Sequence, residues 1–326
     1  MSEMSCPSKE RIGTKIFKNK TTAQIFMLAI AVTVIVIIMC FATDRFYQLN
    51  NLFNILTQIS ILGIAALGAS MVIISGGIDL TLGVIISLSG CSAAALMNNG
   101  SSIEFAVIVG IVVATLCGLL NGVLVVLSKA EPFIITLGMM SVYKGITLLV
   151  TGGANLKIAE GFTFGRTKIF DTIPLPVIIL VIMFLLFYFM LKYTRFGRRI
   201  YAIGSNSEAA YLSGIKINRN KIYIYTLNAF ILGIGAMVLL SRLGSGNSIM
   251  GDSIMLEAIA GAVIGGVVMS GGRGSVWGVF LGVLLIGIIS NSLNLLRVPS
   301  FIQYVTIGVI IVGAVFISNI GGTKKR

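Results

Sequence analysis

Long runs without a charged residue dominate the chain. Eight of them exceed the roughly 18 residues that a membrane-spanning helix requires. They cover residues 21–43, 46–78, 80–103, 105–128, 172–191, 222–241, 274–296 and 298–323. Two further apolar stretches, 132–156 and 254–272, are interrupted by one charge each, Lys144 and Glu257. The pattern predicts about ten spanning helices, within a range of nine to eleven. Because the run 46–78 begins with polar residues at 48–51, we also expect a short interfacial segment before its helix.

Two glycine-rich strings interrupt this pattern at membrane depth. Residues 75–83 read Ser-Gly-Gly-Ile-Asp-Leu-Thr-Leu-Gly, and they contain Gly76, Gly77 and Asp79. Residues 270–278 repeat the Ser-Gly-Gly, with Gly271 and Gly272, and hint at an internal repeat of the kind found in many transporters. Both strings predict broken or re-entrant helices, which are tolerated only where protein or a cavity surrounds the backbone.

Asp79 has two interpretations on sequence alone. A carboxylate in the membrane is costly and requires a partner, so it is a candidate gate or pathway element together with the four glycines. It is also well placed to accept backbone N–H groups at a helix start. Both interpretations stay open.

Composition agrees with a membrane protein. Hydrophobic residues make up 56% of the 326 residues and charged residues 11%, whereas soluble domains carry about 25% charged residues. The chain has no histidine, which excludes Ser-His-Asp and Cys-His catalysis, and its four cysteines lack metal-ligand spacing. We therefore expect an all-α polytopic bundle that is not an enzyme and holds no cofactor or metal.

The charges predict the orientation in the membrane. Most of the 24 Lys and Arg residues lie in the N-terminal tail, in 192–221 and at the C-terminus, and an even number of helices puts these segments on one side. The positive-inside rule makes that side cytoplasmic. The net charge of +13 therefore reflects orientation rather than nucleic-acid binding. The expected organisation is a basic cytoplasmic tail over 1–20, one transmembrane domain over 21–320 and a cytoplasmic tail over 321–326.

The segment 192–221 is the long charged loop on the cytoplasmic side. It contains a short predicted helix with Asn206 or Ser207 as N-cap and Gly214 as C-cap. Such an exposed helix serves as a docking surface for a cytoplasmic partner, or it lies on anionic lipid through its basic residues. The residues alone do not decide between these roles.

Several motifs resemble one family. Glu208, Ala209 and Ala210 followed by Gly214 resemble the coupling loop of permease subunits in bacterial ATP-binding-cassette importers. The strings at 50–56, 77–80, 195–199, 212–215 and 294–296 resemble the ribose-type sugar permeases, in the same order over residues 24–318.

The resemblance implies a permease subunit in the bacterial plasma (inner) membrane that forms the translocation path for a monosaccharide. It implies a second permease subunit, identical or not, cytoplasmic ATPase subunits docked at residues 206–214, and an external solute-binding protein that delivers the sugar. The chain itself lacks the Gly-x-x-x-x-Gly-Lys-Ser/Thr loop of ATP-binding proteins.

Some features leave alternatives. The family's Thr-Ser pair is replaced by Val267 and Val268, so the path is expected to be less polar and ribose itself is in question. Lys144 is expected to pair with a carboxylate across the bundle or to extend to the interface, and Glu257 to stabilise a helix N-terminus. The alternative function is an ion-coupled secondary transporter or channel that works through Asp79 or Glu257 without an ATPase.

Overall fold

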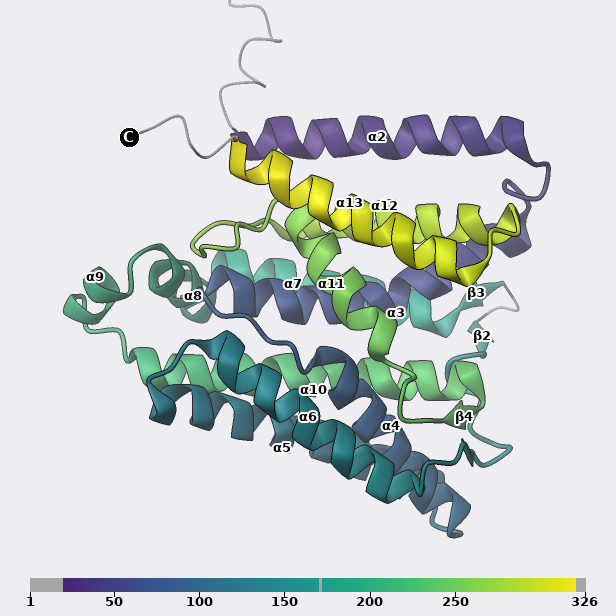
Figure 1. Ribbon diagram of the computed structural model, residues 1–326, viewed down its shortest axis with the longest axis horizontal. Helices are drawn as coiled ribbons and strands as arrows, with labels where there is room; N and C mark the ends of the chain where they lie inside the picture. Colours follow the sequence, from purple (N-terminus) through teal and green to yellow (C-terminus); the bar gives the residue numbers. More distant parts are fainter. Residues whose placement is uncertain (1–19, 170–171, 321–326) are drawn as a thin grey trace, which may run out of the picture.

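A computed structural model of the protein describes residues 20–169 and 172–320 (Figure 1). The chain forms helices almost throughout. They are α2 (Lys20–Ala42), α3 (Leu49–Ile74), α4 (Leu82–Asn98), α5 (Ile103–Ser128), α6 (Pro132–Thr151), α7 (Leu175–Tyr193), α8 (Arg195–Ser205), α9 (Ser207–Leu212), α10 (Ile217–Leu243), α11 (Asp252–Ile264), α12 (Val276–Leu295) and α13 (Ser300–Ile320). Four two-residue strands complete the elements: β1 (Leu156–Lys157), β2 (Lys168–Ile169), β3 (Ile173–Pro174) and β4 (Ser245–Gly246).

The predicted all-α membrane bundle is confirmed. Seven helices in the described part of the chain are long and apolar enough to cross a membrane: α2, α3, α5, α6, α7, α10 and α12. The other predicted spans correspond to α4, α11 and α13, and α4 and α11 are shorter, at 17 and 13 residues. The number of true spans therefore stays a prediction. Residues 1–19 and 321–326, and with them most of the two predicted tails, lie outside the described residues.

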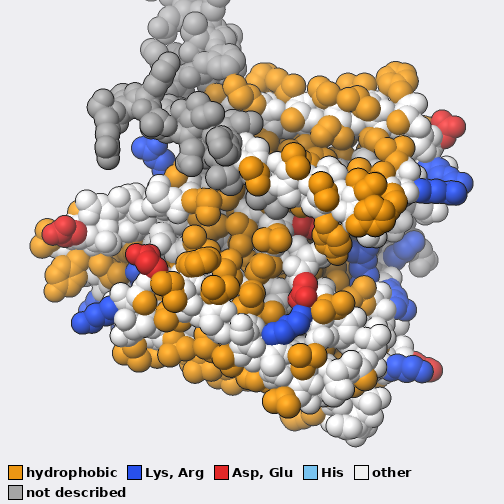
Figure 2. Space-filling model, viewed as in Figure 1, with side chains coloured by type: hydrophobic (Ala, Val, Ile, Leu, Met, Phe, Trp, Pro, Cys, Tyr) orange, Lys and Arg blue, Asp and Glu red, His pale blue; other side chains and the backbone are white. Residues whose placement is uncertain are grey.

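Helix α3 forms the centre of the bundle. Every residue from Ile59 to Ile74 is buried, and α3 packs against α7, α10, α11 and α12. The outer helices show the reverse of a soluble protein's pattern. In α6 the buried residues are Thr136, Tyr143, Thr147 and Thr151, whereas Leu149 is 83% exposed. Hydrophobic side chains likewise cover much of the visible face in Figure 2. This arrangement is expected where lipid surrounds the protein.

Small residues allow the helices to pack closely. A side-chain carbon on Gly278 of α12 would overlap the carbonyl oxygen of Gly265 at the end of α11. A side-chain carbon on Gly118 of α5 would overlap Ala229 of α10. Close backbone approach is the main source of helix association where lipid offers no hydrophobic drive.

The two ends of the bundle differ. Helices α8 and α9, the start of α2 and the end of α13 lie at one end, and the four short strands lie at the other (Figure 1). Strand β1 pairs antiparallel with β4, and β2 with β3. Helices α8 and α9, which belong to the predicted cytoplasmic segment 192–221, therefore lie at the same end as the start of α2 and the end of α13.

Both predicted breaks exist, and three details differ from expectation. The second break begins after Ile264, so that 265–275 is non-helical and the predicted span 254–272 is only half a helix. Helix α11 begins at Asp252, so Glu257 lies beyond its first turn and does not stabilise its N-terminus. Helix α3 begins at Leu49, so the expected interfacial segment is part of the helix itself.

Candidate functional site

Helix α9 has Asn206 as its N-cap, as predicted, whereas its C-cap is Ser213 and the predicted Gly214 is the next residue. The Asn206 side-chain oxygen accepts a hydrogen bond from the Ala209 N–H at 3.0 Å, and Glu208 lies in the first turn. At the other end Gly214 has φ of 79°, its N–H donates to the Tyr211 carbonyl, and the Ile215 N–H donates to the Ala210 carbonyl. These two bonds form a Schellman motif, which favours glycine at the left-handed position.

The exposed surface of α9 is partly apolar. Tyr211 is 69% exposed and Leu212 79% exposed, whereas Ala210 is buried against the bundle. Figure 1 shows α9 projecting beyond the other helices at its end of the molecule. A projecting helix with exposed aromatic and aliphatic side chains is the kind of surface that a protein partner covers.

Helix α8 connects α9 to the bundle. Its Gly197, Ile200 and Ile203 are buried, and its arginines are exposed. Tyr201 donates a hydrogen bond from its hydroxyl to the Gly274 carbonyl at 3.0 Å. Burial raises the pKa of Tyr201, so the hydroxyl keeps the proton that it donates. Helix α8 is therefore attached to the second break.

Gly204 of α8 lies where the two breaks meet. A side-chain carbon on Gly204 would overlap the carbonyl oxygen of Ile74, the last residue of α3. The Gly272 N–H donates to that same carbonyl at 2.8 Å. A side-chain carbon on Gly271 would lie 3.0 Å from the Cα of Gly76 and 2.9 Å from the Gly204 oxygen. We call this contact of residues 74–77, 204–205 and 271–274 the glycine junction.

The glycine junction joins sequence candidates to a residue that the sequence analysis did not single out. Gly76, Gly271 and Gly272 were candidates, and the structure brings them together. Gly204 was predicted only to be part of the cytoplasmic segment 192–221. An isolated glycine within a helix often has a packing role, and that signal could have identified it. The two Ser-Gly-Gly strings are not equivalent in position. Gly76, with a φ of 83°, lies just after the end of α3 and within the first string. The corresponding glycine after α11 is Gly266, with a φ of 89°, which stands before the second string begins.

Asp79 lies in a buried polar network beside the junction. Its Oδ1 accepts hydrogen bonds from the backbone N–H of Thr81 at 2.9 Å and from the Thr81 hydroxyl at 2.5 Å. Its Oδ2 accepts from the Asn228 side-chain amide of α10 at 2.9 Å. Asp79 therefore accepts a backbone N–H near a helix start, as one interpretation held, but Thr81 is the N-cap of α4.

The network continues into α5 and α6. The Asn121 amide donates to the Thr81 hydroxyl oxygen at 2.8 Å, and the Tyr143 hydroxyl donates to Asn121 Oδ1 at 3.0 Å. Thus side chains of three helices, α5, α6 and α10, fix the conformation of residues 79–81. Asn228 Oδ1 is buried and has no partner among the described residues. None of Asn121, Tyr143 and Asn228 was predicted, because isolated polar residues within apolar runs give no signal of which helix they face.

Lys144 pairs with a carboxylate across the bundle, as one of its two interpretations held. The partner is Asp252, 2.8 Å from Lys144 Nζ, and Nζ also donates to the Ser248 carbonyl at 2.7 Å. The sequence analysis missed Asp252, because it stands just outside the apolar run.

Val267 is buried, so that one of the two valines that replace hydroxyl residues lies inside the protein.

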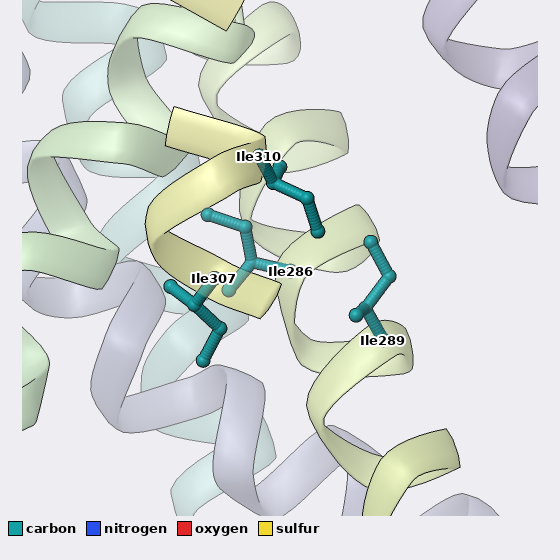
Figure 3. Close-up of a pocket in the computed structure, with 4 residues that line it drawn as sticks. All are labelled: Ile286, Ile289, Ile307 and Ile310. Carbon is teal, nitrogen blue, oxygen red and sulfur yellow. The ribbon is translucent and has the colours of Figure 1, made fainter. Parts of the chain in front are cut away.

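Two cavities lie away from the junction. The first, of about 10 Å³, lies between α12 and α13 and is lined by Ile286, Ile289, Ile307 and Ile310 (Figure 3), which makes it apolar and too small for a sugar. The second, of about 380 Å³, lies at the end of the molecule opposite α9. It is lined by Asn50, Phe53, Asn54, Thr57, Gly165, Arg166, Lys168, Pro174 and Arg242. In the described residues no three His, Cys, Asp or Glu side chains are grouped to hold a metal ion.

Comparison with known proteins places the chain in a family. Residues 51–317 match the family described as "Branched-chain amino acid transport system / permease component". The chain is 40% identical to the ribose import permease protein of Bacillus subtilis over 289 residues, which cover 88% of this chain and 90% of that protein.

Two further relatives extend the comparison. The chain is 36% identical to the ribose import permease protein of Escherichia coli K12, over 89% of this chain and 92% of that protein. It is 34% identical to the D-allose transport system permease protein of the same organism, over 90% of both chains. No solved structure matches the chain. The family match, together with the apolar helices, shows that the chain is a multi-pass inner-membrane protein that belongs to this family of permease components.

Proposed function

We propose that the chain forms the translocation path of an ATP-driven importer for a monosaccharide. Cytoplasmic ATPase subunits would dock on α9, a second permease subunit would complete the path, and an external solute-binding protein would deliver the sugar. The sugar class is supported by the names of relatives that import ribose and allose. The ATP-driven mode is supported by the projecting, capped helix α9 with its exposed Tyr211 and Leu212.

The glycine junction is the observation that carries this proposal. Helix α8 follows the α7 span and leads directly into α9, and its Gly204 touches the ends of both broken segments. A displacement of α9 by an ATPase would therefore be transmitted through α8 to α3 and to the connection before α12. Coupling of this kind requires an element whose position is influenced by both sites, here the ATPase at α9 and the broken segments. Helix α8 connects the two and is such an element.

The opposite end of the molecule fits the delivery of a solute. The cavity of about 380 Å³ combines amide, hydroxyl and basic side chains, so that it is open to a polar solute. By the orientation that the charge pattern predicts, this end faces away from the cytoplasm.

Substitution at Gly214 tests the coupling role of α9. Gly214→Val forces a β-branched residue into the left-handed region and should disrupt the end of α9, whereas Gly214→Asn is tolerated there. We expect Gly214→Val to abolish ATP-dependent D-ribose uptake by proteoliposomes that contain the complete transporter, and Gly214→Asn to retain most of it. Both variants should insert normally, because α9 lies outside the spanning helices. Full uptake by Gly214→Val would contradict the coupling role.

The same assay distinguishes the ATP-driven importer from the alternative function, an ion-coupled transporter. If the chain takes up D-ribose without an ATPase, and ionophores stop that uptake, an ion-coupled transporter replaces the importer. If uptake requires ATP hydrolysis and is insensitive to ionophores, the importer stands.

A further inference from the structure

Lys144 and Asp252 lie deep within the membrane-spanning part of the molecule. Lys144 is twelve residues after the start of α6 and seven before its end, or about 18 Å and 10 Å along the helix. Asp252 follows Gly251, whose N–H donates to the Ser87 hydroxyl of α4 at 3.0 Å. Ser87 is eleven residues from the outer end of α4, about 16 Å along that helix. The pair is therefore far from either surface.

The ion pair is nevertheless open to its surroundings. The Lys144 side chain is 30% exposed and that of Asp252 is 47% exposed. Charged groups at this depth face the interior of a bundle or a water-filled cavity rather than lipid. Figure 2 shows few charged side chains on the largely hydrophobic face formed by α6, α11 and α13. By this tendency, protein or water rather than lipid covers the pair in the membrane.

The first two turns of α11 carry further polar side chains beside the ion pair, and we call Lys144, Asp252, Ser253 and Glu257 together the polar strip. Asp252, Ser253 and Leu256 are exposed, and Glu257 is half-buried on the same side of the helix. Glu257 forms no hydrogen bond or ion pair with any residue in 20–169 or 172–320. The chain before α11, residues 247–251, is non-helical at this depth, which is tolerated where backbone lines a cavity.

We propose that this strip of α6 and α11 is one wall of the translocation path, and that Lys144, Asp252 and Glu257 bind hydroxyl groups of the passing solute. This inference rests on the proposed function and names its pathway and solute class. An ammonium group only donates hydrogen bonds and a carboxylate only accepts them, whereas a hydroxyl does both. A neutral polyhydroxylated solute can therefore form hydrogen bonds with all three side chains, as donor to the carboxylates and as acceptor from the ammonium group.

The charges disfavour other solutes. The strip has one ammonium and two carboxyl groups, and its ammonium is already neutralised by Asp252. The carboxylate of an amino acid or of another anionic solute finds no free cation here. A neutral sugar or related polyol is the class that remains.

Thiol labelling in membranes tests the wall directly. Ser253→Cys on α11 is compared with Leu185→Cys, which is 59% exposed in the middle of α7, in a complete transporter whose native cysteines are replaced. A positively charged methanethiosulfonate reagent should modify Ser253→Cys roughly tenfold faster or more, because a thiolate and a charged reagent both require water. N-ethylmaleimide, which is neutral, controls for the presence of both thiols. Equal, slow labelling of the two variants by the charged reagent would overturn the proposal.

Uptake by charge variants tests the solute contacts. The exchange Lys144→Asp with Asp252→Lys rebuilds the ion pair, so a merely structural pair would recover wild-type uptake. We expect the exchanged variant to assemble but to take up D-ribose with an apparent KM roughly tenfold higher, the effect of misplacing charge-assisted hydrogen bonds. Glu257→Gln should raise the apparent KM in the same direction. Wild-type uptake by both variants, or competition by leucine in place of sugar, would refute the solute contacts.

The two proposals fail differently. If the wild-type transporter shows no ATP-dependent D-ribose uptake, the proposed function fails. The labelling comparison of Ser253→Cys with Leu185→Cys still decides whether the strip lies in water.

Discussion

At the scale of single residues, Asp79 shows how the bundle holds a buried carboxylate without a nearby cation. Its three hydrogen-bond donors, two on Thr81 and one on Asn228, are all neutral. The only ion pair among residues 20–169 and 172–320 is that of Lys144 and Asp252. Neutral donors fix the carboxylate in one orientation, and this orientation sets the turn between α3 and α4.

Removal of the Asp79 carboxylate should destabilise this turn. Asp79→Ala leaves buried donors of Thr81 and Asn228 unsatisfied, each at a cost of about 1–3 kcal/mol. We expect a lower melting temperature for the purified protein in detergent, and a smaller decrease for Asp79→Asn, whose amide oxygen still accepts from Thr81. Asp44→Ala, which changes an exposed carboxylate, is the control and should leave the melting temperature unchanged. A wild-type melting temperature for Asp79→Ala would show that the network contributes nothing.

At the scale of elements, α8 depends on the absence of a side chain at Gly204. Gly204→Ala places a carbon into the Ile74 carbonyl, so α8 must move away from α3. We expect this variant to lose most ATP-dependent uptake and to melt at a lower temperature, because overpacking of a tight contact costs about 1–3 kcal/mol.

Gly138→Ala on α6 is the matched control for Gly204→Ala. No atom lies within 4 Å of a carbon added there, and alanine is the better helix former by about 1 kcal/mol. Uptake and melting temperature should stay at or slightly above the wild-type values. If both substitutions behave alike, the glycine junction is not a tight contact.

The helices themselves were largely predictable. Charge-free runs gave the ranges of α2, α5, α7 and α12 to within a few residues, because an apolar run of that length has no other stable conformation in lipid. The prediction for 254–272 was too long. Apolar composition is uniform across Ile264, and only the Gly265-Gly266 pair marks where the helix ends.

At the scale of the whole molecule, the two ends are predicted to face opposite sides of the membrane. Single cysteines at exposed positions test this: Ser213→Cys beside α9 and Thr163→Cys in the loop at the other end. In intact cells lacking the native cysteines of the chain, a membrane-impermeant maleimide should label Thr163→Cys and spare Ser213→Cys. Lysed cells should show both labelled. The reverse pattern would invert the orientation that the positive-inside rule assigns.

The sequence by itself determined the class of molecule, the approximate helices, the two breaks and the N-cap of α9. These follow from local composition and from the few residues that favour a turn or a cap, such as Asn206 and Gly214. The sidedness of the basic segments stays a prediction of the positive-inside rule.

Only the tertiary structure decided which side chains meet. The junction of Gly76, Gly204 and Gly271, and the pairing of Lys144 with Asp252, join residues far apart in the chain. An apolar helix in lipid carries hydrophobic residues on every side, so its sequence does not state which face a lone polar or small residue occupies. That choice is made by the packing of the whole bundle, and it places the candidate path on α6 and α11.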